Sequence, residues 1–199
     1  MRPDAPIVNA GYRSTNFWVV GRGPARLLID LGWPGLVGAL LAELERKSVP
    51  AVEIRYGLAT HYHIDHAGAA QDLKNLGMTL LVTEEQVAAV RLMKQWTKPA
   101  DRYTEIVPAG NRVISCAESR AVLAGLDLAG EIVPTPGHSD DSVSLVLDQG
   151  VAFTGDLTLE QMATEADAEV VAGSWDRLRR LGVRTVYPGH GAPYPLRRG

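Results

Sequence analysis

The stretch Thr60-His61-Tyr62-His63-Ile64-Asp65-His66 holds three of the five histidines of this 199-residue chain. It follows an apolar segment that predicts a strand (residues 54–60) and precedes a predicted helix (residues 67–76). The loop at the carboxyl end of a strand is where open sheets place their binding sites. Burying so many imidazoles and carboxylates without an ion would leave several polar groups unsatisfied. The stretch therefore predicts a metal site.

The spacing within this stretch predicts two neighbouring ions. His61 and His63 alternate, so on an extended backbone their imidazoles point to the same side and can bind one ion. Asp65 and His66 come where the chain turns into the helix, and can face a second ion. A lone histidine is more often a hydrogen-bonded core or surface residue, but that alternative is weak for a group this concentrated.

The remaining two histidines and one further aspartate occur in a shared sequence context. Each follows a predicted strand and is directly preceded by glycine: His138 after residues 131–135, Asp156 after residues 151–154, and His190 after residues 184–187. Glycine lets the backbone turn sharply and direct the next side chain toward a common point. All five histidines are therefore expected at strand ends.

Strands and helices alternate along the rest of the chain. The turn Gly21-Arg22-Gly23-Pro24 predicts a β-hairpin, and the pairs Thr83/Gln86 and Ser115/Glu118 predict capped helix starts. Further strands are expected at residues 79–82 and 142–147, and helices at residues 34–44, 83–96, 116–124 and 166–181. Because βα units mix with hairpins, both parallel and antiparallel pairing are required, which predicts a mixed α/β domain. No G-x-G-x-x-G or phosphate-binding loop accompanies it.

Length and composition predict one compact domain over residues 1–199. The formal net charge of −3 gives no positive field to attract nucleic acid. The single Cys116 cannot form an intrachain disulfide and suits a reducing compartment. No apolar segment has the length of a signal peptide core or a membrane helix, so we expect a cytoplasmic protein without membrane or nucleic-acid partners.

In five motifs the chain resembles the metallo-β-lactamase superfamily. The first quoted stretch resembles its H-x-H-x-D-H signature, and the others, in order, are Leu28-Ile29-Asp30-Leu31-Gly32, Pro136-Gly137-His138-Ser139, Thr154-Gly155-Asp156 and Pro188-Gly189-His190-Gly191. The resemblance covers residues 16–191. It implies an α/β fold (α+β by some schemes), an αββα four-layer sandwich of two mixed β-sheets with metals at one edge. A helix at residues 116–124 departs from the strands common there.

The resemblance also implies the ligand set. It assigns one ion to His61, His63 and His138, a second to Asp65, His66 and His190, and a bridging position to Asp156. Asp30 is expected to hydrogen-bond the loop that carries the ligands, so that its mutation weakens metal retention. Two Zn²⁺ ions are expected, with iron or manganese as alternatives, and no organic cofactor.

This site implies hydrolysis of a small ester, thioester or lactone. Two ions can share a hydroxide, which becomes the nucleophile at neutral pH, while Asp65 is the expected catalytic proton carrier. Lactamases of the superfamily carry Cys or Ser in place of Asp156, and its lactonases carry Tyr where this chain has Leu159. Its hydroxyacylglutathione hydrolases share the full ligand set but add a glutathione-binding helical domain. The alternatives are an iron-dependent persulfide dioxygenase, a hydrolase with β-lactamase activity and, ranked last, a non-catalytic relative.

Aromatic residues near the expected site are candidates for the substrate pocket. They are Trp18, Trp33, Trp96, Tyr103 and Tyr194, and the alternative for each is ordinary core packing. The polar, proline- and glycine-containing residues 98–112 predict a loop or lid. A small-molecule substrate is expected, and a homo-oligomeric assembly is left open.

Overall fold

The computed structural model describes residues 4–197 and contains two mixed β-sheets. The first sheet has the order β1 (Ile7–Asn9), β2 (Trp18–Val20), β3 (Arg26–Ile29), β4 (Ile54–Leu58), β5 (Thr79–Thr83) and β6 (Arg112–Ile114). Strands β1 to β3 pair antiparallel, because short turns connect them. Strands β3 to β6 pair parallel, because a helical crossover separates each pair.

The second sheet has the order β11-β10-β9-β8-β7. Its strands are β7 (Gly130–Pro134), β8 (Val143–Leu147), β9 (Val151–Gly155), β10 (Thr185–Pro188) and β11 (Tyr194–Pro195). Only β9 and β10 pair parallel, through the crossover helix α6 (Ala168–Arg180). As a result β7, β9 and β10 all run in one direction, and their carboxyl ends lie at the same edge of the sheet.

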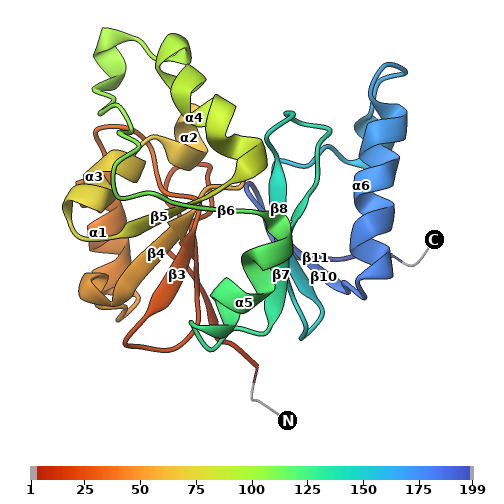
Figure 1. Ribbon diagram of the computed structural model, residues 1–199, viewed down its shortest axis with the longest axis horizontal. Coiled ribbons are helices and arrows are strands. Elements are labelled where there is room, and N and C mark those ends of the chain that lie inside the picture. Colours follow the sequence, from red (N-terminus) through yellow and green to blue (C-terminus); the bar gives the residue numbers. More distant parts are fainter. Residues whose placement is uncertain (1–3, 198–199) are drawn as a thin grey trace.

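The two sheets face each other, and helices cover the outer face of each (Figure 1). The first sheet is covered by α1 (Val37–Arg46), α2 (Ile64–Ala67), α3 (Ala70–Asn75) and α4 (Val87–Leu92), and the second by α6. Helix α5 (Ser119–Ala124) contributes Val122 and Leu123 to the core between the sheets. Short 3₁₀ turns occupy Ala51–Glu53, Glu84–Gln86, Met93–Trp96, Pro99–Asp101, Cys116–Glu118 and Glu160–Met162.

Three apolar layers hold these elements together. In β8 every residue is buried, with Leu145 packed between the sheets and Val146 packed toward α6. In β3, Leu27 and Ile29 likewise face the second sheet, while Leu28 faces the helices. This alternation follows from the two-residue period of a strand that is covered on both faces. The predicted four-layer αββα sandwich is confirmed.

Local expectations are mostly confirmed. The helix predicted at residues 116–124 exists as a 3₁₀ turn followed by α5, and its start is capped: Ser115 Oγ accepts from the Glu118 N–H and Glu118 Oε2 accepts from the Ser115 N–H. The helix predicted at residues 67–76 is confirmed over Ala70–Asn75 as α3, but its predicted start is wrong, because the chain breaks between α2 and α3. A Cβ on Gly68 would lie 2.3 Å from Pro34 Cδ, so close packing of the Pro34 turn occupies this break.

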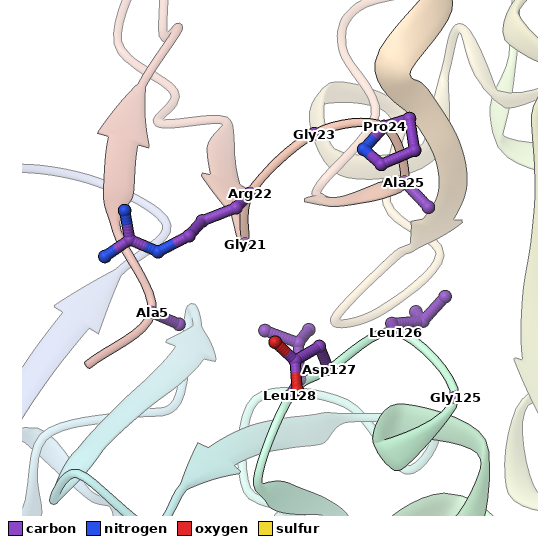
Figure 2. Close-up of a pocket in the computed structure, with 10 residues that line it drawn as sticks. All are labelled: Ala5, Gly21, Arg22, Gly23, Pro24, Ala25, Gly125, Leu126, Asp127 and Leu128. Carbon is purple, nitrogen blue, oxygen red and sulfur yellow. The ribbon is translucent and has the colours of Figure 1, made fainter. Parts of the chain in front are cut away.

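The end of the sandwich that lies away from the predicted metal ligands contains a cavity. A cavity of about 260 Å³ lies between the hairpin turn at residues 21–25 and residues 125–128 (Figure 2). It lies at the amino end of β3, whereas the predicted metal ligands follow the carboxyl ends of strands. Within residues 4–197, no helix is both long and apolar enough to cross a membrane.

Candidate metal centre

Four loops bring the predicted ligands to one edge of the sandwich. One loop follows β4 in the first sheet and leads into α2, and the other three follow β7, β9 and β10 in the second sheet. These loops carry His61, His63, Asp65 and His66, then His138, Asp156 and His190. All seven side chains belong to clusters whose potential ligand atoms lie within 4.8 Å of one another.

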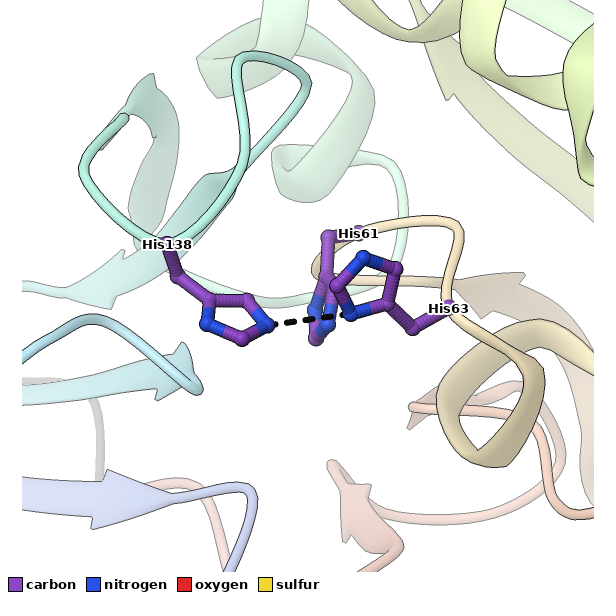
Figure 3. Close-up of side chains that lie close together, drawn as sticks. All are labelled: His61, His63 and His138. Atoms are coloured by element: carbon purple, nitrogen blue, oxygen red, sulfur yellow. Dashed lines mark hydrogen bonds between the residues drawn. The ribbon is translucent and has the colours of Figure 1, made fainter. Parts of the chain in front are cut away.

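The first cluster consists of three imidazoles from both sheets. His63 Nδ1 lies 3.0 Å from His138 Nε2, and the His61 ring centroid lies 4.5 Å from that of His63 and 4.7 Å from that of His138. The three rings converge on a common point (Figure 3). Nitrogen donors in this arrangement match the preference of zinc and similar transition metals.

The second cluster joins a buried histidine to an acid and an exposed histidine. Asp65 Oδ2 lies 3.4 Å from His66 Nε2 and 3.3 Å from His190 Nε2. Asp156 connects the two clusters: its Oδ1 lies 3.3 Å from His66 Nε2, and its Oδ2 lies 3.2 Å from His190 Nε2 and 3.8 Å from His138 Nε2. Asp156 thus lies between the two clusters.

The residues fit a cation. His61 Nε2, His66 Nε2 and Asp156 Oδ1 are buried and have no hydrogen-bond partner. Buried polar atoms are normally paired, so three orphans at one place indicate a missing partner. Gly189 lets the backbone pass close to the Asp156 carboxylate, since a Cβ at this position would lie only 2.4 Å from Asp156 Oδ1. Glycine at this position therefore serves close approach rather than an unusual backbone angle.

Asp30 hydrogen-bonds both the backbone and a ligand side chain of the loop that follows β4. Its carboxylate is 1% exposed, and Oδ1 accepts hydrogen bonds from the Thr60 N–H and hydroxyl, both at 2.8 Å. Its Oδ2 lies 2.9 Å from His66 Nδ1, which leaves His66 Nε2 directed toward the cluster. The expectation that Asp30 hydrogen-bonds the loop is confirmed, and such contacts fix the tautomer and orientation of a ligand histidine.

Sequence reasoning missed three further supporting contacts. Thr15 Oγ1 donates to Asp65 Oδ2 at 3.1 Å, His190 Nδ1 lies 2.6 Å from the Ser14 carbonyl, and the Tyr62 N–H donates to Asp141 Oδ2 at 2.8 Å. The one available signal was chemical: the polar Ser14-Thr15-Asn16 segment directly precedes the buried Phe17 and β2.

The electrostatics suit ligation. Burial, then the neighbouring imidazoles, lower the pKa of His61 well below its usual value, so this ring is neutral. Burial also tends to lower the pKa of His66, but the Asp30 carboxylate, followed by Asp156 and Asp65, raises it well above the usual value. Although burial opposes it, the neighbouring His66 imidazole holds the pKa of Asp65 below its usual range, so that carboxylate is ionised. A cation would take the place of the His66 proton.

The structure brings one of the five predicted pocket aromatics to a cavity beside this cluster. Tyr194 lines it, together with His138, Asp156 and His190. Trp18 is not at the surface: it is 4% exposed, packs between the sheets and donates Nε1–H to the Pro188 carbonyl.

The other three aromatics do not line that cavity. Trp33 is half-buried beneath the Arg13 guanidinium, Trp96 is 76% exposed, and Tyr103 packs beside α3 and α4 with its hydroxyl accepting from the Ile106 N–H. Whether any of them contacts a substrate stays a prediction.

Fold and cluster together define an αββα sandwich with a candidate metal centre whose ligands come from both sheets. The family model described as the metallo-beta-lactamase superfamily matches residues 10–190. The chain belongs to this superfamily, which confirms the resemblance seen in its motifs.

Individual proteins resemble this chain in sequence or in fold over most of its length. An atrochrysone carboxyl ACP thioesterase from Aspergillus fumigatus is 32% identical over 187 residues, covering 90% of this chain and 51% of that protein. A lactamase-like protein from Penicillium aethiopicum is 33% identical over 184 residues, covering 90% and 52%. The chain thus spans about half the length of these relatives. A metallo-beta-lactamase family protein from Thermus thermophilus shares the fold, with TM-score 0.75 and 21% identity over 98% of this chain and 75% of that one.

Proposed function

We propose that this chain is a metal-dependent hydrolase that cleaves a small acyl thioester, using two divalent ions, preferably zinc. The observation that carries the proposal is the set of orphaned buried ligand atoms on His61, His66 and Asp156, which a cation would satisfy. The choice of a thioester is supported by the relative named as a thioesterase, at 32% identity.

The ligand residues divide into two groups. His61, His63 and His138 would hold one ion, Asp65, His66 and His190 the other, and Asp156 would contact both. When bound, the ions supply a Lewis acid for the substrate carbonyl and a nucleophile derived from water at neutral pH. In the net reaction water adds across the C–S bond: its oxygen joins the acyl carbon, and a proton goes to the departing sulfur.

Asp65 is suited to handle that proton. Its carboxylate is ionised and 17% exposed, accepts a hydrogen bond from Thr15 Oγ1, and lies beside the imidazoles of His66 and His190. Because its pKa is low, Asp65 is a weak base. We therefore assign it the orientation of the attacking water and the relay of a proton to the leaving group, rather than strong proton abstraction.

Metal content and thioester hydrolysis, measured on the same preparations, test this function. We expect two zinc ions per chain and release of free thiol from acyl thioesters. Asp156→Ala should lose at least one ion and about 1,000-fold in kcat/KM, since metal-ion stabilisation of a transition state is worth several kcal/mol. Asp140→Ala is the matched control, because Asp140 is an exposed acid two residues from His138.

Two results would contradict the proposal. One is unchanged hydrolysis by Asp156→Ala or by chelated protein. The other is a preparation that contains iron, consumes oxygen with a persulfide and leaves thioesters intact, which would favour the dioxygenase alternative.

A further inference from the structure

A cavity of about 360 Å³ opens directly onto the candidate metal centre. One side is formed by three candidate ligands, His138, Asp156 and His190. The other side is formed by the loop that follows β9 and by the first residue of β11; its large side chains are Leu157, Leu159, Met162 and Tyr194. A group attached to a carbonyl at the metal centre would therefore extend into an open, largely apolar hollow.

The chemistry of this lining restricts what it can hold. Leu157 is 6% exposed, Leu159 is half-buried, and Met162 is 68% exposed at the mouth. Among the residues that the structure describes, no lysine or arginine lines the cavity. An anionic substituent would lose its hydrating water there without gaining a cationic partner, whereas each buried methylene gains roughly threefold to fourfold in affinity.

We propose that this cavity is the acyl-binding pocket of the enzyme, that it takes a compact, uncharged, apolar acyl group, and that Leu159 and Tyr194 set the size limit. This inference rests on the proposed thioester hydrolysis. The volume lies at the lower end of the range for ligand pockets, roughly 300–1,000 Å³. It therefore suits a short chain or a single ring rather than a long chain.

The wall that carries Leu159 is held rigidly. Trp175 Nε1 donates to the Thr158 carbonyl at 2.8 Å, and Thr158 Oγ1 donates to the Gly137 carbonyl at 2.9 Å. One residue past Leu159, the Glu160 carboxylate is paired with Arg179 of α6. Because helix α6 fixes this loop, the pocket has a defined size instead of adapting to each ligand.

A second hollow lies next to this cavity, on the other side of Leu159 and Tyr194. It measures about 420 Å³ and shares Leu159 and Tyr194 with the first. The rest of its lining mixes apolar with polar and charged side chains: Glu160, Gln161, Trp175, Arg179, Pro195, Leu196 and Arg197. The Tyr194 ring and the Leu159 side chain thus separate two spaces. Removal of the ring should join the spaces and admit longer acyl groups, whereas a larger residue at position 159 should shorten the first space.

The test is a series of acyl thioesters of N-acetylcysteamine, from acetyl through butyryl, hexanoyl and decanoyl to dodecanoyl, with benzoyl and succinyl added. For the wild-type enzyme kcat/KM should rise to the butyryl or hexanoyl substrate, accept benzoyl, and fall for dodecanoyl and succinyl. Tyr194→Ala should raise the dodecanoyl-to-hexanoyl ratio about tenfold, and Leu159→Trp should lower the hexanoyl-to-acetyl ratio about tenfold.

Two controls separate size from other effects. Tyr194→Phe keeps the ring and removes only the hydroxyl, so its dodecanoyl-to-hexanoyl ratio should stay near the wild-type ratio even if its absolute rates differ. Leu76→Ala alters an exposed leucine at the end of α3 and should change nothing. Unchanged chain-length profiles in both Tyr194→Ala and Leu159→Trp, in protein that still hydrolyses thioesters, would overturn the pocket assignment while leaving the proposed function intact.

A binding measurement keeps the two proposals distinguishable. The product carboxylates of the same series can be titrated into zinc-loaded protein by calorimetry, with no turnover required. If no thioester is hydrolysed but hexanoate binds more tightly than dodecanoate, and Tyr194→Ala reverses that order, the pocket stands and the reaction is wrong. If neither hydrolysis nor chain-length-dependent binding is found, both are wrong.

Discussion

At the scale of single residues, Asp30 joins the backbone of the ligand loop to a ligand side chain. Its two oxygens hold the Thr60 N–H, the Thr60 hydroxyl and His66 Nδ1. It does so from a left-handed backbone conformation, with φ of 60°, at the point where the chain leaves β3. Strained backbone of this kind persists where surrounding contacts determine it, and the contacts here are those of the candidate site.

Asp30→Asn should weaken metal binding without removing a ligand. The amide keeps the volume but carries no charge and offers one oxygen acceptor instead of two, so it cannot satisfy both Thr60 and His66. We expect zinc affinity to fall about 10-fold to 100-fold, measured by competition with a chromophoric chelator. Glu45→Gln, an exposed acid on α1, serves as the control. Wild-type affinity in Asp30→Asn would show that the contact is dispensable.

The candidate ligands were predictable because they lie in short motifs, each following a strand. The residues that hydrogen-bond these ligands and their loops were not predictable. Thr15 lies 50 positions from Asp65, Asp141 lies 79 positions from Tyr62, and Ser14 lies 176 positions from His190. These contacts depend on how the sheets stack and where turns end, which no local pattern encodes.

At the scale of elements, predictability followed the strength of the local pattern. The hairpin, the buried strand β8 and helix α6 have long apolar runs or clear periodicity, and all were expected. Strands β1, β6 and β11 were missed, because they have only two or three residues each and gain their structure from pairing with a neighbour.

The segment between the 3₁₀ turn Pro99–Asp101 and β6 shows how a loop without regular structure can be ordered. Lys74 of α3 donates from Nζ to the Val107 carbonyl at 2.5 Å, to the Ala109 carbonyl at 3.0 Å, and to Asn111 Oδ1. The ammonium thus replaces the partners that a strand would have given to these carbonyls. Lys74 thus fixes part of the segment expected to form a lid to α3, together with Gln71, which accepts from the Val107 N–H, and Asp72, which accepts from Thr104 Oγ1.

Lys74→Met should loosen residues 107–111 of that segment, while Gln71 and Asp72 keep their bonds to Val107 and Thr104. The methionine keeps the aliphatic stem but removes three charge-assisted bonds, of which the exposed setting leaves a net loss of about 1 kcal/mol in unfolding free energy. Urea denaturation would measure the loss, and hydrogen exchange should accelerate at residues 107–111. Lys47→Met, at the exposed end of α1, is the matched control. Equal exchange in both variants would rule out the anchoring role.

At the scale of the whole molecule, the two sheets are joined at the edge that bears the candidate ligands. The Val143 N–H of the second sheet donates to the Thr60 carbonyl at 2.8 Å, and the Asn16 N–H donates to the Gly189 carbonyl at 2.7 Å. Both bonds link loops that carry candidate ligands or directly adjoin them. Ions shared by His61, His63 and His138 on one side, and by His66 and His190 on the other, would add links between the same loops.

Removal of the metal should therefore loosen this edge and spare the rest of the sandwich. At free metal 100-fold above Kd, one site contributes about 2.7 kcal/mol to stability, so chelation should lower Tm by several degrees. Amide exchange should accelerate at Asn16, Thr60, Val143 and Gly189, whose bonds join the ligand loops, while Leu145 in the buried strand β8 stays protected. The same chelator should have a smaller effect on Asp156→Ala, since that variant is expected to have lost at least one ion already. Uniform acceleration across β8 would instead mean that the metal stabilises the whole fold, and no change at any of these amides would mean that the edge is held by its backbone bonds alone.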